Sequence, residues 1–247
     1  MPLPELLHTR TIDAEMNGLH SACLGGQHVR LGGLAMEGVI RTAVAADAAA
    51  ITALRQAEYS TSHEFTLLSA SSLAWGPDDE FGLVLAAVRT DGTIVSTMRA
   101  RIFASKSVFE RSSGLDLSPV ELPAPTWFLD RASTHAGFRK CGLNAMLRYH
   151  LLKAAAGQDS PSVSGWLFSG VSRTKTMVEI GYCFTPVTAT QPRGYRHMES
   201  PGRDYVVAVL PHAALTHACR RLEQMLGGEL ERWPWTGPEL PEAGMVS

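Results

Sequence analysis

The stretch FRKCGLN, residues 138–144, has the residue types that bind phosphate, and it joins an apolar segment to a helical pattern. The N-terminus of a helix carries unpaired backbone N–H groups and a partial positive charge, so anions bind there. Gly142 lets the backbone approach a ligand without a Cβ in the way, and Arg139 and Lys140 add positive charge. The spacing predicts a turn that holds a pyrophosphate. An ordinary strand–turn–helix connection with a solvated basic pair is the alternative.

The segments around this turn predict a mixed sheet with helices. Two β-rich runs flank Asp91-Gly92, a dipeptide that suits a tight hairpin turn. Strands that pair locally are followed by strands that alternate with helices, which indicates an α/β fold. Further strands are expected at 39–44, 126–133, 164–171 and 205–210, and helices after Asp47 and at 142–156, 174–181 and 212–227.

The remaining segments are expected to be irregular. Residues 1–38 are interpreted as an N-terminal extension, 39–228 as a single domain and 229–247 as a loosely ordered C-terminal tail. Pro, Ser and Gly residues throughout 105–125 and 185–204 predict loops.

The composition argues against several classes of protein. The formal net charge is −2, so no sequence-wide basic field points to nucleic acid. No apolar run approaches the ~20 residues that span a bilayer, and the N-terminus lacks the long apolar segment of a signal peptide. The cysteines stand singly and the histidines form no HExxH pattern, so no metal is expected. These features predict a cytoplasmic protein without a transmembrane segment.

The segment ASTHAGFRKCGLNAMLRYHLL, 132–152, resembles motif A of the GNAT acyltransferase superfamily. In that family a central strand leads into a loop, Arg/Gln-x-x-Gly-x-Gly/Ala, that holds the pyrophosphate of a pantetheine donor. Arg139 and Gly142 match this loop, and Asn144 stands where Gly or Ala is usual. The resemblance extends over about 39–210. It implies a mixed, mostly antiparallel central sheet flanked by helices, with a V-shaped splay between two central strands.

Two further stretches resemble the branch that contains acyl-homoserine-lactone synthases and N-acyl amino acid synthases. TIVSTMRA resembles a hairpin strand of that branch and aligns Arg99 with its arginine. WFLDRAS resembles its WELSRFA strand, with Phe128 in place of the glutamate. Asp130 is expected on the same face as Phe128, because side chains alternate along a strand. Met177 stands where many GNAT acetyltransferases have a tyrosine general acid, and a thioether cannot donate a proton.

The implied reaction is the attack of an amine on a thioester carbonyl, which needs a deprotonated amine, a stabilised oxyanion and a leaving thiolate. Asp130 and Glu58 are the candidate bases, acting directly or through water. Arg99 and Arg131 are candidates to hold an acceptor carboxylate, because a guanidinium binds carboxylates in a bidentate geometry. A buried structural ion pair is the alternative for Asp130 and both arginines. A solvated helix face is the alternative for Glu58.

The sequence thus predicts an N-acyltransferase that moves an acyl group from acyl-CoA or acyl carrier protein to a small-molecule amine, such as an amino acid. An acetyl-CoA-dependent N-acetyltransferase and a non-catalytic module that binds an acyl donor are the alternatives. An acidic carrier protein needs a basic surface near the donor site, and Arg139, Lys140, Arg148 and Lys153 are candidates for it. The expected donor-binding residues are Ala132, Ser133, Thr134, Arg139, Lys140, Cys141, Gly142, Leu143, Asn144 and Ala145.

Overall fold

A computed structural model describes residues 37–60, 70–169, 171, 173–189, 205–237 and 245–246. These residues belong to one compact unit, Met36–Ser247. The expected extension, 1–38, lies outside the described residues except for Glu37 and for Gly38, where the first strand begins.

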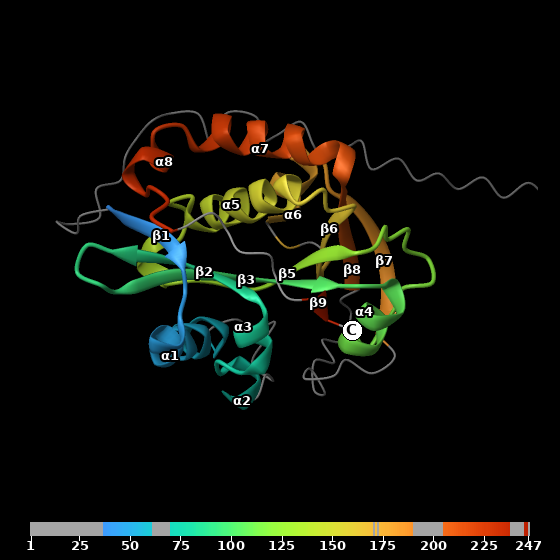
Figure 1. Ribbon diagram of the computed structural model, residues 1–247, viewed down its shortest axis with the longest axis horizontal. Coiled ribbons are helices and arrows are strands. Elements are labelled where there is room, and N and C mark those ends of the chain that lie inside the picture. The colour runs from blue at the N-terminus through green and yellow to red at the C-terminus, as the bar shows by residue number, and fades with distance from the viewer. Residues whose placement is uncertain are drawn as a thin grey trace, which may run out of the picture. The chain divides into compact units, whose positions relative to one another are not determined.

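The described strands form one mixed sheet (Figure 1). Their order is β1-β2-β3-β5-β6-β8-β7-β4, and β9 pairs with β3. Neighbouring strands are antiparallel except for the pairs β5–β6 and β3–β9. The strands are β1 Gly38–Thr42, β2 Leu83–Arg89, β3 Ile94–Phe103, β4 Leu115–Asp116, β5 Thr126–Thr134, β6 Ser162–Phe168, β7 Cys183–Ala189, β8 Tyr205–Pro211 and β9 Met245–Val246. The predicted fold class is confirmed.

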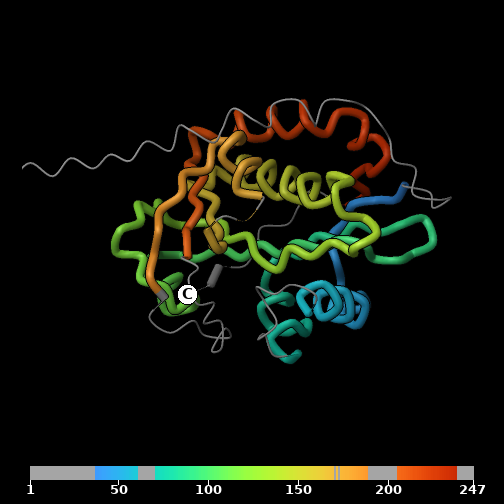
Figure 2. The backbone as a smooth tube through the Cα atoms, turned by 180° about the vertical axis from the view of Figure 1, so that it is seen from behind, coloured from blue at the N-terminus to red at the C-terminus, as the bar shows by residue number. Residues whose placement is uncertain are grey.

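Helices cover both faces of the sheet. In Figures 1 and 2, α5, α6 and α7 lie on one face, and α1 to α4 lie on the other. The largest apolar cluster packs α5 and α7 against the sheet, and smaller clusters lie beneath α4 and α1. The helices are α1 Ala48–Ser60, α2 Ala70–Leu73, α3 Pro77–Phe81, α4 Lys106–Ser113, α5 Leu143–Gly157, α6 Arg173–Glu179, α7 His212–Leu226 and α8 Glu229–Arg232.

Two expected loops contain regular structure instead. Within 105–125, α4 begins after Ser105, whose Oγ accepts a hydrogen bond from the Val108 N–H, and ends at Gly114 with a φ of 70°. Both are ordinary helix boundary signals, and the polar sequence between them obscured the helix. The prediction of a loop at 185–204 is wrong for 185–189, which belong to β7, and 190–204 lie outside the described residues.

The prediction that residues 229–247 form a loosely ordered tail is wrong for the first half of that range. Trp233 is 1% exposed and packs in the main core. The Ile40 N–H donates to the Pro234 carbonyl at 2.9 Å, and the Thr236 N–H donates to the Ile40 carbonyl at 3.0 Å. Residues 234–236 therefore cover the free edge of β1 and close that side of the sheet.

Candidate active site

The strands β5 and β6 diverge in the middle of the sheet. They pair only where Thr126–Phe128 meets Ser162–Ser164. Beyond that point β6 continues to pair with β8 as far as Phe168, and β5 continues with β3. Among the described residues, Leu129, Asp130, Ser133 and Thr134 therefore pair with β3 and with no strand on the β6 side. This is the splay that the resemblance implied.

The course of β5 changes at Arg131. Its φ is 52°, in the left-handed region that a side chain with a Cβ seldom adopts. The β3–β5 register is irregular close by, between Thr97 and Arg99. Strained residues of this kind cluster at ligand-binding and catalytic sites, because the surrounding structure must hold them in place.

The predicted phosphate turn lies directly beyond β5. A short 3-10 turn, Ala136–Phe138, leads into Arg139–Gly142, and α5 begins at Leu143. Gly142 has a φ of 77°, and no side chain caps the first turn of α5. Its backbone N–H groups are thus available to an anion. Lys140 also has a positive φ, 64°.

A cavity of about 300 Å³, which we call the turn cavity, opens beside this turn. It lies between the start of α5 and α6, and it brings together most of the residues predicted to bind a donor. Ala132 instead lines a second cavity, which lies in the splay, and Ser133 and Cys141 line neither of the two. The turn cavity is lined by Thr134, Phe138, Arg139, Lys140, Gly142, Leu143, Asn144, Ala145, Arg148, Arg173, Thr176, Met177 and Leu222.

Cys141 is a structural residue of the turn. Its Sγ is 3.5 Å from the Arg139 carbonyl oxygen, to which the thiol donates. Burial, with a smaller contribution from Glu229, raises the pKa of the thiol, so the reactive thiolate is disfavoured.

Glu58 reaches the phosphate turn from the opposite side. It stands near the end of α1, and its side chain is only 10% exposed, so it is not on a solvated helix face. One carboxylate oxygen accepts from the Ala136 N–H at 2.9 Å, and the other accepts from Arg139 Nη2 at 2.5 Å. Glu58 therefore holds both the backbone and the arginine of the turn.

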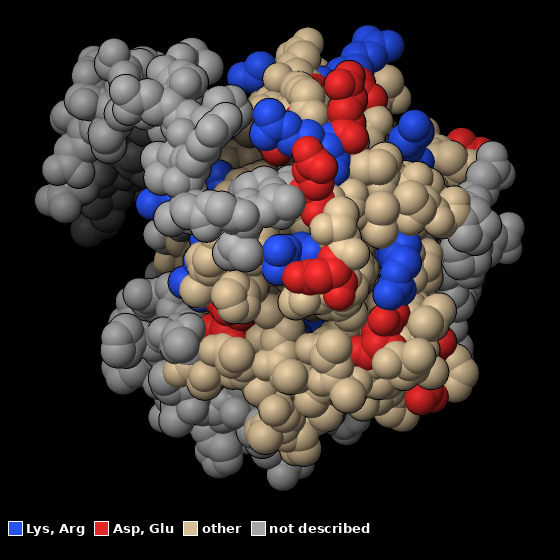
Figure 3. Space-filling view, turned by 90° about the vertical axis from the view of Figure 1, so that its left-hand side faces the viewer, with Lys and Arg blue, Asp and Glu red and all other residues tan. Residues whose placement is uncertain are grey.

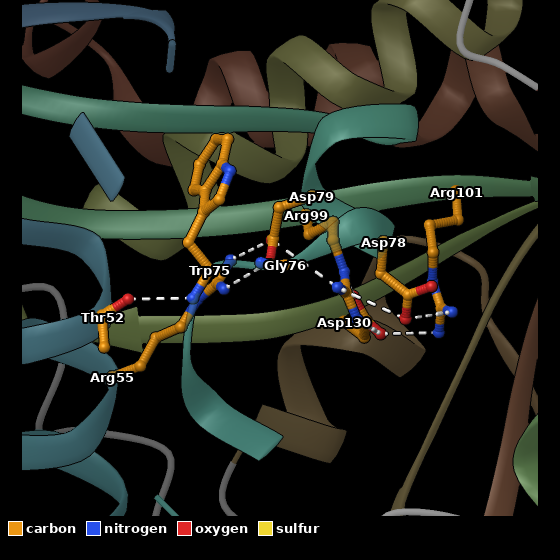
Figure 4. A network of polar contacts seen from close by, with 9 residues as sticks. All are labelled: Thr52, Arg55, Trp75, Gly76, Asp78, Asp79, Arg99, Arg101 and Asp130. Carbon is orange, nitrogen blue, oxygen red and sulfur yellow. Dashed lines mark hydrogen bonds and ion pairs between the residues drawn. The ribbon is translucent and has the colours of Figure 1, made fainter. Parts of the chain in front are cut away.

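A network of three arginines and three aspartates, buried except for Asp78, adjoins the splay through Asp130 (Figure 4). Arg99 donates to both oxygens of Asp130, each at 2.7 Å, and Arg101 donates to the same carboxylate at 2.9 Å. Arg55 makes a bidentate pair with the buried Asp79 at 2.7 and 3.1 Å. We call this network, Arg55, Asp78, Asp79, Arg99, Arg101 and Asp130, the arginine–aspartate cluster.

The cluster determines the charge of its central pair. Burial alone would raise the pKa of Asp130, but Arg99 and Arg101 outweigh it and lower that pKa well below its ordinary value. Burial alone would lower the pKa of Arg99, but Asp130 outweighs it and raises that pKa. Every guanidinium nitrogen of Arg99 lies within 3.6 Å of an aspartate oxygen. This geometry favours the structural ion pair, the alternative that the sequence left open.

A second, smaller cavity of about 50 Å³ lies in the splay itself, and we call it the splay cavity. Asp130, Arg131 and Ala132 of β5 form one wall. Tyr59 reaches it from α1, and Arg148 and Met177 reach it from α5 and α6. Arg148, Arg173 and Met177 line both cavities. The two cavities are therefore adjacent, and they lead from the phosphate turn into the sheet.

Sequence reasoning missed the partners that the fold brings to the site. Asp79 and Tyr59 come from segments remote from β5 in the sequence, and no local pattern connects them to it. Arg55 did carry a signal, because it shares a helical face with Ile51 and Leu54, and all three are buried. A charge on an apolar helix face implies a buried partner of opposite charge.

The expected basic surface for a carrier protein is only partly present. Arg139, Lys140 and Lys153 are exposed, but Arg148 is 9% exposed and faces the interior, so its assignment to a surface patch is wrong. Figure 3 shows positive and negative side chains interspersed over the described part of one face.

Within the described ranges, no group of His, Cys, Asp and Glu side chains is arranged to hold a metal ion, and no helix is long and apolar enough to cross a membrane.

The fold is that of the GNAT acyltransferases. Among solved structures, the chain is similar to the CoA-dependent acyl-homoserine lactone synthase BjaI, solved with SAM and isopentyl-CoA, with a TM-score of 0.58 and 15% identity over 82% of this chain and 94% of that chain. An N-acetyltransferase from Staphylococcus aureus Mu50 has a TM-score of 0.49 and 10% identity over 71% of this chain and 98% of that chain. At 15% identity, the likeness to BjaI shows the fold alone. The sequence itself matches no protein-family model and no curated protein.

Proposed function

We propose that this protein is an N-acyltransferase that transfers an acyl group from a phosphopantetheine thioester, either acyl-CoA or acyl carrier protein, to the amine of a small molecule such as an amino acid. The adjacency of the turn cavity and the splay cavity, which share Arg148, Arg173 and Met177 in their walls, is the observation that supports the proposal. A donor whose pyrophosphate lies at Gly142 extends along α5, and its thioester reaches the splay between β5 and β6.

The unpaired side of β5 supplies the polar backbone that such a donor needs. In the part of the chain that the structure describes, the backbone of Leu129, Asp130 and Ala132 pairs with no strand on the β6 side, and we propose that it binds the pantetheine amides and the oxyanion. Preorganised backbone donors at that position stabilise the tetrahedral intermediate without reorganisation during the reaction.

The two candidate carboxylates have different roles in this proposal. Asp130 is a poor base, because Arg99 and Arg101 hold it ionised, and it fixes β3 to β5 beside the splay. Glu58 orients Arg139 toward the donor. The amine proton passes to water.

The small volume of the splay cavity favours a short acyl group. The cavity measures about 50 Å³, against about 300 Å³ for the turn cavity, and the similar synthase BjaI was solved with isopentyl-CoA. A short-chain or acetyl-CoA-dependent N-acyltransferase is therefore the second candidate, beside transfer of a long chain from a carrier protein.

A turnover assay with parallel donors tests the proposal. The purified protein is incubated with acetyl-CoA, a five-carbon acyl-CoA, palmitoyl-CoA or palmitoyl carrier protein, each with a mixture of amino acids and simple amines. Thiol release and amide formation are measured by absorbance and mass spectrometry. We expect amide formation with at least one donor and none with the Gly142→Glu variant. A donor that binds but is never consumed would instead identify a non-catalytic binding module.

A further inference from the structure

Arg148 is a buried arginine that pairs with no carboxylate among the described residues. It lies in the second turn of α5 and is 9% exposed. Its Nη1 donates to the Tyr182 hydroxyl at 3.1 Å, and its guanidinium carbon lies 5.6 Å from the centroid of the Tyr182 ring. Among the residues that the structure describes, no carboxylate forms an ion pair with it. A buried cation in this position is stabilised when an anion enters the cavity that it lines.

The position of Arg148 identifies the part of the donor that it meets. It is one of the residues that line both the turn cavity and the splay cavity. It lies five residues after the start of α5, which is about 8 Å along the helix axis. Its side chain extends from there into the splay cavity, where the thioester of a donor held at the turn is proposed to lie, so the guanidinium can face the thioester sulfur.

We propose that Arg148 stabilises the thiolate that leaves when the thioester is cleaved. This inference rests on the proposed acyl transfer. The amine nitrogen forms a bond to the carbonyl carbon, the C–S bond breaks, and its electron pair remains on sulfur as the thiolate. The amine proton goes to water, and solvent later protonates the thiolate. Arg148 remains a cation throughout and supplies charge and an N–H donor.

The neighbours of Arg148 suit this role. Met177 shares both cavity walls with it, and a thioether has no proton to donate to a leaving thiolate. Burial raises the pKa of the Tyr182 phenol, although Arg148 opposes this, so the hydroxyl stays neutral and accepts the hydrogen bond from Arg148. Tyr182 lines neither cavity and is a positioning residue for the guanidinium.

A kinetic test varies the leaving group. We compare an alkyl thioester of CoA with an aryl thioester of the same acyl group, whose thiolate needs little stabilisation. Arg148→Met should lower kcat by roughly 10²–10³-fold with the CoA thioester, as loss of a transition-state donor does, and by much less with the aryl thioester. Arg148→Lys should restore part of the rate, and Tyr182→Phe should give a smaller loss. Arg111→Met removes an exposed charge from α4 and should change neither rate.

Equal losses with both leaving groups would overturn the proposal. A loss confined to acyl groups that carry a terminal carboxylate would also overturn it, because Arg148 would then bind the acyl group. Far-ultraviolet circular dichroism and the melting temperature of each variant exclude unfolding as the cause of a loss.

A second measurement does not depend on turnover. The thiolate absorbance of protein-bound CoA is titrated against pH for the wild type, Arg148→Met and Arg111→Met. We expect a thiol pKa below that of free CoA in the wild type and Arg111→Met, and the free value in Arg148→Met. Equal pKa values in all three would overturn the role of Arg148 even if acyl transfer occurs. A lowered pKa without transfer to any amine would refute the proposed function and leave the thiolate site intact.

Discussion

Asp130→Asn tests whether the arginine–aspartate cluster holds the core of the site together. Asp130 accepts three charge-assisted hydrogen bonds from Arg99 and Arg101, and its side chain is only 11% exposed. Asparagine keeps one oxygen but turns an NH₂ group toward arginine donors, and it leaves Arg99 buried without its main counterion. Breaking a buried ion pair in this way costs about 3–5 kcal/mol.

The assay is urea unfolding followed by circular dichroism at pH 7. We expect the free energy of unfolding to fall by about 3 kcal/mol with an unchanged m-value, because the folded surface is the same. Glu229→Gln is the matched control, because Glu229 forms an exposed pair with Arg232 at 3.1 Å, and its loss should cost under about 1 kcal/mol.

The pH dependence of the free energy of unfolding provides an independent test of the same ion pair. The pKa of Asp130 is lowered in the folded protein, so its contribution is present above the unfolded pKa of about 3.9 and is lost as the pH falls below that value. The difference between wild type and Asp130→Asn should therefore be constant near neutrality and shrink below about pH 4. A loss of less than about 1 kcal/mol at pH 7 would show that Asp130 is not the structural partner inferred here.

Three further changes probe other parts of the molecule. Gly142→Glu places a carboxylate at the phosphate turn and a Cβ 3.1 Å from Leu226, and we expect it to abolish CoA binding by calorimetry in a folded protein. Burial and Lys153 lower the pKa of His150 to about 4, so the folded protein is destabilised when the pH falls below the ordinary histidine pKa. Between pH 7 and pH 4 the free energy of unfolding of the wild type should fall by about 2–3 kcal/mol. In urea titrations at each pH, His150→Gln should show a smaller fall, because it lacks the titrating imidazole. Trp233→Ala should lower the free energy of unfolding by about 3–5 kcal/mol in the same assay, because Trp233 is 1% exposed. A small loss would show that residues 229–236 do not contribute to the core.

Features encoded by neighbouring residues were predictable from the sequence. The hairpin turn at Asp91-Gly92 and the helix after Gly142 each depend on a few consecutive residues, and both are present, with Gly92 at a φ of 83°. The residues of the phosphate turn form one continuous segment, and all of them except Cys141 line the turn cavity, so their proximity could be predicted without knowledge of the tertiary fold.

Features that depend on tertiary contacts were not predictable in the same way. The cluster joins Arg55, Asp79, Arg99 and Asp130 from α1, α3, β3 and β5, and no local pattern specifies which aspartate meets which arginine. Arg148 was expected at the surface because it lies in a basic stretch. It is buried because α5 packs against the sheet on one side and α7 on the other, so most of that helix's circumference is covered.

The most direct test of the acyl-donor site is thermal unfolding of the purified protein with CoA, acetyl-CoA, a five-carbon acyl-CoA, palmitoyl-CoA and palmitoyl carrier protein. A ligand that binds only the folded state stabilises it by about 2.7 kcal/mol at a hundredfold excess over Kd. We expect at least one thioester donor to raise the melting temperature of the wild type and to have no effect on Gly142→Glu. If no donor shifts the melting temperature of the wild type, residues 138–144 form an ordinary strand–turn–helix connection and the proposed acyl-donor site is wrong.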